Sequence, residues 1–213
     1  GTVVNNVAMT QVADSGAATR TYELSYALPA NAPAGAWTVR VVATEGTEGT
    51  VTDLGVGAFT VVIPMPVLVV AKTSQVISDP FNNTVNPKRI PGSVQMYSVT
   101  VTNQGPGTVD SSTLAITDPV PANSALFVST ASGDPVAFVN GSPVSGLTYN
   151  YAAHVSYSNQ PGGGAPYNYT PSPDANGFDP NVTGLRIAPA GTMNAASGAG
   201  NPSFTVRFRV RLE

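Results

Sequence analysis

Apolar and polar residues alternate with a period of two along the first 63 residues. In residues 21–28, tyrosine and leucine occupy the even positions, and polar or small residues occupy the odd ones. Residues 36–44 repeat the pattern, residues 59–63 show a shorter version of it, and residues 2–11 show a weaker one. Alternation of this kind is typical of half-buried β-strands. The pattern therefore predicts four strands in this part of the chain.

A second and larger group of strands follows a short stiff segment, Pro64-Met65-Pro66. Each proline fixes its own φ and biases the residue before it to extended geometry, so we expect a hinge and a domain boundary at residues 64–66. The strands expected beyond it span residues 67–73, 95–103, 113–117, 125–129, 136–139, 147–158, 182–187 and 203–212. Since no segment has a convincing 3.6-residue period, almost no helix is expected. We predict an all-β fold with two immunoglobulin-like β-sandwich domains in tandem, residues 1–63 and 67–213.

The first predicted domain is too small to be complete. Four strands fall short of the roughly seven strands and ~100 residues of a self-sufficient immunoglobulin-like sandwich. A half-sandwich would leave its apolar face and its strand edges open, which soluble monomers avoid. We therefore expect a strand from outside this chain's own residues 1–63 to complete it. The candidate donors are residues 203–212, residues 2–12, and a segment cleaved from a precursor. A chain that starts at Gly1 fits either a processed secreted protein or a trimmed fragment.

Residues 159–181 form the one long segment without a strand pattern. Loops longer than about 12–15 residues are usually functional or disordered. Tyr167 and Tyr169 lie in this loop and are candidates for an exposed aromatic pair that contacts a glycan or a protein. By contrast, Tyr149, Tyr151 and Tyr157 share one face of an expected strand and are assigned to the core, as Trp37 is in its own strand.

Composition narrows the class of protein. Charged residues are 10% and hydrophobic residues 42% of the chain, which is not the signature of disorder. A net charge of −3 argues against a nucleic-acid partner, because phosphate binding needs clustered Lys and Arg. The absence of cysteine excludes disulfides, thiolate metal sites and cysteine nucleophiles. The longest apolar run, residues 64–71, is too short to span a bilayer, so we expect no membrane span.

No set of residues predicts catalysis. His154, the only histidine, falls on the polar face of its expected strand and has no distinctive serine or aspartate partner, so we expect no catalytic residue and no enzyme activity. Residues 174–179 alternate oxygen ligands around Gly177 as calcium loops do, but the later bidentate glutamate is missing. Turn chemistry explains the same residues, so we expect neither a metal nor a cofactor. Asn82, Asn140, Asn168 and Asn181 begin glycosylation sequons, which chance largely explains in so Asn-, Ser- and Thr-rich a chain.

Two cationic features concern the strand surfaces. Lys72 lies in an apolar strand, and because the last strand contains no asparagine we expect no Lys–Asn isopeptide bond. Lys72 is instead expected to face outward and guard the sheet edge against pairing. Arg207, Arg209 and Arg211 form a one-sided ladder on the last strand. The ladder is either a solvated face or an interface, because arginine is favoured at protein contacts.

The second predicted domain resembles a bacterial and archaeal surface repeat known as domain of unknown function 11. The likeness rests on Pro91-Gly92, on Tyr97-Ser-Val-Thr-Val-Thr-Asn103-Gln-Gly105, on Ile116-Thr-Asp118-Pro-Val-Pro121 and on the last strand, residues 204–212. The resemblance covers residues 67–213 and implies an immunoglobulin-like sandwich in large cell-surface or secreted proteins, without chemistry of its own. Residues 28–37, with Leu28-Pro and Ala34-Gly35-x-Trp37, look like generic bacterial immunoglobulin-like modules.

These observations lead to one functional expectation and two alternatives. The leading hypothesis is an extracellular structural subunit that assembles with copies of itself, or with another surface protein, into a filament or layer by strand exchange or end-to-end docking. The first alternative is a glycan- or protein-binding module of an adhesin, supported by the tyrosine-bearing loop. The second is an accessory region of a larger secreted protein.

Overall fold

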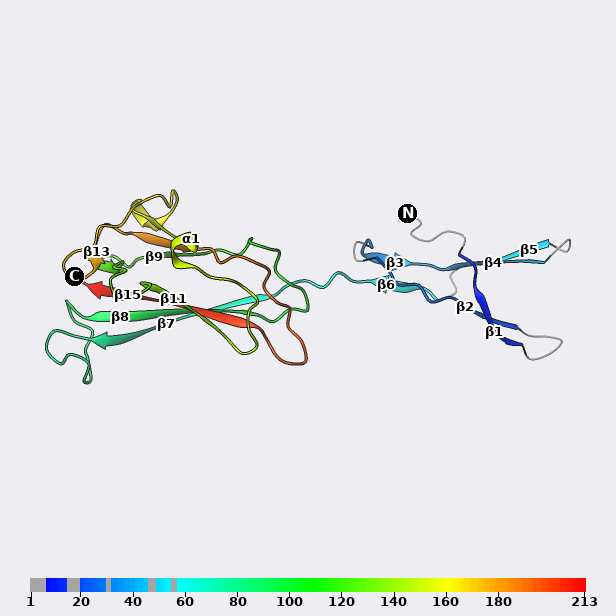
Figure 1. Ribbon diagram of the computed structural model, residues 1–213, viewed down its shortest axis with the longest axis horizontal. Coiled ribbons are helices and arrows are strands. Elements are labelled where there is room, and N and C mark those ends of the chain that lie inside the picture. The colour runs from blue at the N-terminus through cyan, green and yellow to red at the C-terminus, as the bar shows by residue number, and fades with distance from the viewer. Residues whose placement is uncertain (1–6, 15–19, 30–31, 46–48, 55–56) are drawn as a thin grey trace. The chain divides into compact units, whose positions relative to one another are not determined.

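The computed structural model describes residues 7–14, 20–29, 32–45, 49–54 and 57–213. Contacts divide the chain into two units, unit 1 (Gly1–Ile63) and unit 2 (Pro64–Glu213), and each is described by itself. The regular structure of both is almost entirely β, with one short α-helix and one 3-10 turn among the described residues (Figure 1). The predicted all-β class is therefore confirmed.

Unit 1 contains three two-stranded antiparallel sheets. They are β1 (Thr10–Asp14) with β2 (Arg20–Glu23), β3 (Gly35–Trp37) with β6 (Phe59–Val61), and β4 (Arg40–Glu45) with β5 (Gly49–Leu54). The single strand predicted over residues 36–44 is wrong, since the ladder breaks at residues 38–39. The strand predicted over residues 21–28 keeps its ladder only to Glu23. The sequence did not indicate β5, because its apolar Val51 is 72% exposed and marks no buried face.

Unit 2 contains two larger sheets. The first has the order β13-β10-β15-β8-β7, and β11 also pairs with β15; the second has the order β12-β14-β9. The strands are β7 (Leu68–Ser78), β8 (Val94–Asn103), β9 (Ile116–Pro119), β10 (Ser124–Phe127), β11 (Val136–Asn140), β12 (Val155–Ser158), β13 (Phe178–Asp179), β14 (Gly184–Ile187) and β15 (Ser203–Leu212).

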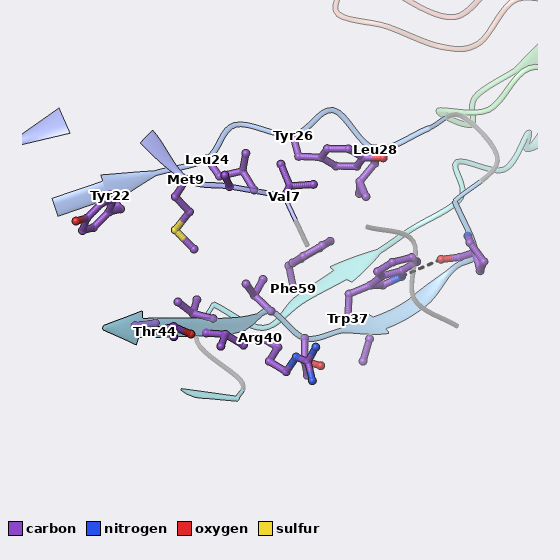
Figure 2. A pocket seen from close by; sticks show the side chains of 18 of the residues that line it. Val7, Met9, Tyr22, Leu24, Tyr26, Leu28, Trp37, Arg40, Thr44 and Phe59 are labelled. Carbon is purple, nitrogen blue, oxygen red and sulfur yellow. Dashed lines mark hydrogen bonds between the residues drawn. The ribbon is translucent and has the colours of Figure 1, made fainter. Parts of the chain in front are cut away.

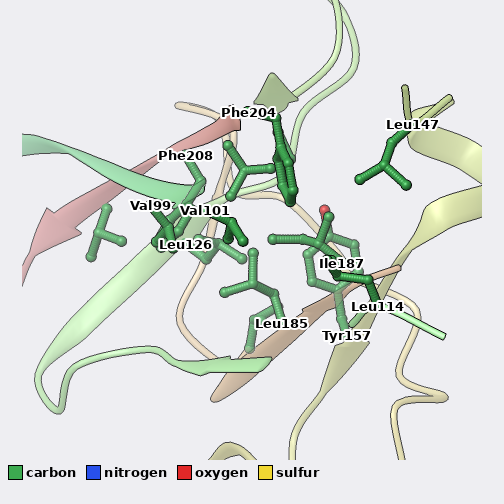
Figure 3. Close-up of a cluster of buried hydrophobic side chains, with 14 of the residues drawn as sticks. Val99, Val101, Leu114, Leu126, Leu147, Tyr157, Leu185, Ile187, Phe204 and Phe208 are labelled. Carbon is green, nitrogen blue, oxygen red and sulfur yellow. The ribbon is translucent and has the colours of Figure 1, made fainter. Parts of the chain in front are cut away.

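The two sheets of unit 2 share one apolar core (Figure 3). From the first sheet, β15 contributes Phe204 and Phe208, which are 0% and 2% exposed. From the second, β14 contributes Leu185 and Ile187, both 0% exposed. Alternate residues of β15 are buried because successive side chains of a strand point to opposite faces. The result is a sandwich-like arrangement in which β15 is central, so residues 203–212 are not free to serve as a donor strand, and that candidate is wrong.

Two segments of unit 2 differ from the sequence prediction. The strand expected over residues 147–158 is interrupted by the one-turn helix α1 (Tyr151–His154), whose first turn is capped by the Asn150 side chain accepting from the Ala153 amide at 3.1 Å. The long loop 159–181 contains a 3-10 turn, η1 (Pro161–Gly163), and the short strand β13. Both departures depend on local hydrogen bonds, which a period-two pattern of apolar residues does not reveal.

The segment after Ile63 is tied to unit 2 by Asn103. This side chain is fully buried, and its Oδ1 accepts hydrogen bonds from the amides of Val67 and Gly105, each at 3.0 Å. Its Nδ2 donates to the carbonyls of Gly107 and Asn194 at 2.7 and 2.9 Å. A Cβ at Gly105 would collide with the backbone of residues 65–67, so the close approach requires glycine there. The segment Asn103-Gln104-Gly105 thus anchors the start of unit 2.

Candidate functional site

Unit 1 contains an open cleft of about 1690 Å³ between two walls of its own residues. One wall carries Tyr22, Leu24, Tyr26 and Leu28 together with Val7 and Met9, and the opposite wall carries Trp37, Phe59, Arg40 and Thr44 (Figure 2). The wall that carries the tyrosines and leucines arises from the alternation in residues 21–28, which points every second side chain to the same side. The tyrosines and leucines at the even positions of residues 21–28 therefore line one space with Trp37 and Phe59.

The apolar side chains of the cleft are only half covered. Tyr22, Leu24, Tyr26 and Leu28 are 39–49% exposed, and Phe59 is 41% exposed. Among the residues of unit 1 whose side-chain exposure the structure describes, Ala32 alone is buried. Exposed apolar side chains are ordinary when scattered, but a contiguous set that rims a cleft marks an interaction surface.

Trp37 is held in place in one wall of this cleft. Its Nε1 donates to the Pro33 carbonyl at 3.0 Å, and its ring stacks with Phe59 at a centroid distance of 6.3 Å. The predicted core position of Trp37 is thus an apolar position in the cleft wall, and the ring remains partly exposed. A side chain held by two contacts is pre-ordered, so a partner that covers it loses little side-chain entropy on binding.

The lining of the cleft mixes polar groups with its apolar side chains. Among the described residues, Arg40 is the one charged residue of that lining, beside the threonines Thr38 and Thr44. The sequence pattern did not indicate Arg40, because it alternates with Val39 and Val41. The apolar side chains suit an extended segment that alternates apolar and polar residues.

The arginine ladder of β15 is largely engaged within unit 2. The Arg209 guanidinium lies 3.7 Å from the centroid of the Phe127 ring. Arg211 donates to Asp174 at 3.0 Å and to Glu213 at 2.7 Å, and it lies over Phe178 at 4.7 Å. Arg207 is exposed. Of the three arginines of the ladder, only Arg207 is exposed, whereas Arg209 and Arg211 are partly covered.

The long loop holds its polar groups in internal hydrogen bonds. Tyr169 packs against the core and donates from its hydroxyl to Asp179 at 3.0 Å, while Tyr167 is partly exposed. Desolvation raises the pKa of the Tyr169 hydroxyl, and the bond to Asp179 acts in the same direction. Tyr167 and Tyr169 are thus both partly exposed, and Tyr169 is engaged by the core and by Asp179.

Asp174 and Asp179 serve as acceptors for turns. Asp174 Oδ1 accepts from the amides of Asn176 and Phe178 at 2.8 and 2.9 Å, which lowers the pKa of its carboxyl. Asp179 accepts from the amides of Ser172 and Asn181 at 2.7 and 2.8 Å. In the part of the chain that the structure describes, no group of three or more His, Asp or Glu side chains is placed to hold a metal ion.

Lys72 does not face outward as predicted. Its Nζ donates to Asp118 Oδ1 of β9 at 2.6 Å and lies 4.8 Å from the centroid of the Tyr97 ring. Lys72 therefore links the edge of one sheet of unit 2 to the edge of the other. The attraction of the Asp118 carboxylate, whose side chain is 8% exposed, favours this contact over full solvation of the Lys72 ammonium.

His154 lies at the end of α1, where its Nδ1 accepts from the Asn150 amide at 2.9 Å. The histidine thus closes a turn rather than pairing with a nucleophile. The asparagines of the four sequons are all exposed.

Among the described residues there is no helix long and apolar enough to cross a membrane. Comparison with known proteins adds no identity: no family model, no curated protein and no solved structure matches the chain.

Proposed function

We propose that this chain is an extracellular structural subunit whose unit 1 is completed by a β-strand from another chain. The observation that carries the proposal is the cleft of unit 1, whose large apolar side chains are 39–49% exposed. Fully burying a side chain of this size contributes roughly 1.5–3 kcal/mol, so covering several at once is a substantial driving force against a typical stability of about 5–15 kcal/mol.

A strand fits the cleft better than a compact ligand does. Residues 24–28 make no ladder in the described structure, while Leu24, Tyr26 and Leu28 line the cleft. An added strand offers backbone hydrogen bonds to such a segment and alternating side chains to the space beside it. Completed in this way, unit 1 becomes an immunoglobulin-like sandwich in tandem with that of unit 2. Strand exchange of this kind joins subunits into a filament or layer.

The cell-surface location rests on the resemblance of residues 67–213 to a surface repeat, and on a composition of few charges without cysteine. The donor is a strand of another copy or of another surface protein. A glycan-binding adhesin module is the second candidate function, favoured by the aromatic rings of Tyr22, Tyr26 and Trp37 in one open cleft. Retention of a monomer on immobilised polysaccharide would favour that second function.

The test is sedimentation velocity over a range of concentrations, with Tyr26→Lys compared with Val51→Lys. Tyr26 lines the cleft, whereas Val51 is 72% exposed and lies outside it. We expect the unmodified chain and Val51→Lys to form larger species than Tyr26→Lys does, because only Tyr26→Lys loses the cleft contact. Equal association of all three proteins, or a monomer at every concentration, would contradict the proposal.

A further inference from the structure

Strand β7 lies at one edge of the larger sheet of unit 2 and pairs only with β8 in the described structure. Val67, just before β7, and the first three residues of the strand, Leu68, Val69 and Val70, are apolar. They are 52%, 43%, 42% and 61% exposed. An edge strand presents unpaired N–H and C=O groups, and an apolar edge is a ready template for pairing with another chain. This segment, residues 67–71, is called the β7 edge below.

Part of the β7 edge faces the space between the sheets. Leu68 is opposite Asn103 and Val70 is opposite Val101 in the antiparallel ladder, and both of these partners on β8 are buried. Directly opposite residues point to the same face of a sheet. Leu68 and Val70 therefore lie on the inward face of the sheet but stay exposed.

The charges that normally protect such an edge are engaged elsewhere. Lys72 is the one charged residue of β7, and its ammonium is held by Asp118 at 2.6 Å. Arg89 donates to Ser74 at 3.1 Å and so lies beside the later half of the strand. The β7 edge itself carries no charge, so two copies of it meet without repulsion between like charges.

We propose that the β7 edge pairs antiparallel with the β7 edge of a second copy of this chain. The two-fold axis of such a pair is perpendicular to the sheet, so the inward faces of both copies lie on the same side. A register centred on Val69 places Leu68 of each copy opposite Val70 of the other, and the four side chains cover one another. The absence of charge makes the strand complementary to itself, which is what an interface between identical patches requires.

This interface goes beyond the proposed function and does not rest on it. The cleft of unit 1 accepts a strand, whereas the β7 edge of unit 2 joins two identical edges. A subunit that carries both contacts connects to more than one neighbour, as a filament of paired strands or a layer needs.

Cysteine trapping tests the pairing, because the natural chain has no cysteine. In a register centred on Val69 the two Val69 Cα atoms lie roughly 4.5–5.5 Å apart, within the span of a disulfide. Val139→Cys is the matched control, since Val139 is a strand residue of unit 2 with 45% exposure against 42% for Val69. Under mild oxidation, Val69→Cys should become a disulfide-linked dimer and Val139→Cys should stay monomeric. A mixture of Val67→Cys and Ala71→Cys should form the mixed dimer in preference to either symmetric one.

Failure of Val69→Cys to cross-link, with its circular dichroism unchanged, would overturn the pairing, as would equal cross-linking of Val139→Cys. A second measurement uses no disulfide. Val70→Lys should weaken self-association of the β7 edge by about tenfold or more, because each dimer loses two apolar contacts and gains two cations. Unchanged association of that variant would equally overturn the pairing. Loss of the cleft contact by Tyr26→Lys should leave the Val69→Cys dimer intact, so the two proposals fail separately.

Discussion

Two leucines with opposite environments distinguish an interaction surface from a core. Leu24 in the cleft of unit 1 is 44% exposed, and Leu185 in the core of unit 2 is 0% exposed. Replacing each by alanine removes the same atoms, so the difference between the two results reports the environment alone. We expect Leu24→Ala to impair assembly and Leu185→Ala to impair folding of unit 2.

The magnitudes follow from the exposures. Full burial of leucine contributes about 1.5–3 kcal/mol, so a side chain 44% exposed has about 1 kcal/mol still to gain from a partner. Leu24→Ala should therefore weaken assembly about fivefold, and Leu24→Ala with Phe59→Ala about thirtyfold. Leu185→Ala leaves a cavity in a closed core, for which the expected loss is about 2–5 kcal/mol of unfolding free energy.

The assays are sedimentation velocity for assembly and urea unfolding for stability. Trp37 is the only tryptophan and lies in unit 1, so its fluorescence reports that unit, and circular dichroism reports both. In the dilute monomer, Leu24→Ala should lower the unfolding free energy of unit 1 by about 1–1.5 kcal/mol, the part of the burial that is already present. If instead it destabilises the monomer as much as Leu185→Ala does unit 2, and leaves assembly unchanged, the cleft is already packed within the chain and the reasoning fails.

Three further predictions concern unit 2. Lys72→Met should lower the unfolding free energy of unit 2 by about 1–3 kcal/mol, because Asp118 is left nearly buried and unpaired. In a double-mutant cycle, the double variant Lys72→Met, Asp118→Asn should recover part of that loss. Additive losses would show that the two side chains are not coupled. Asn103→Ala should cost about 2–4 kcal/mol in urea unfolding, because four hydrogen bonds are lost and their backbone partners are left without acceptor or donor; a change below about 1 kcal/mol would contradict this. The amide of Asn82, ahead of those of Lys88 and Phe81, holds the pKa of Asp79 far below its ordinary value. The stability that Asp79 contributes should therefore be complete above about pH 5 and fade as the pH falls below about 4, so the melting temperatures of the chain and of Asp79→Asn should differ more at about pH 6 than at about pH 2; a constant difference would contradict the assignment.

Strand positions in unit 2 were predictable wherever a strand buries one face. Residues 203–212 alternate without interruption, and β15 has those same bounds because it lies at the centre of a sheet with one face on the core. Residues 95–103 gave β8 to within one residue for the same reason. Strands β5 and β13 left no such pattern, since Val51 of β5 is exposed and β13 has two residues.

Side-chain partners were less predictable than strands. The direction of Lys72 depends on Asp118, which lies 46 positions away and on a different sheet. The engagement of Arg209 and Arg211 depends on Phe127, Phe178 and Asp174, and none of these is linked to β15 by any sequence pattern. One wall of the cleft of unit 1, in contrast, could be predicted from the even positions of residues 21–28, because alternation alone decides which side chains share a face.

Hydrogen–deuterium exchange of residues 24–28 tests the central claim most directly. These residues line the cleft and belong to no ladder in the described structure. If a strand from another chain completes unit 1, their amides should exchange rapidly in the dilute monomer and become protected when the chain assembles, while amides of β15 stay protected in both. Protection already present in the monomer, or rapid exchange that persists in the assembly, would contradict the account.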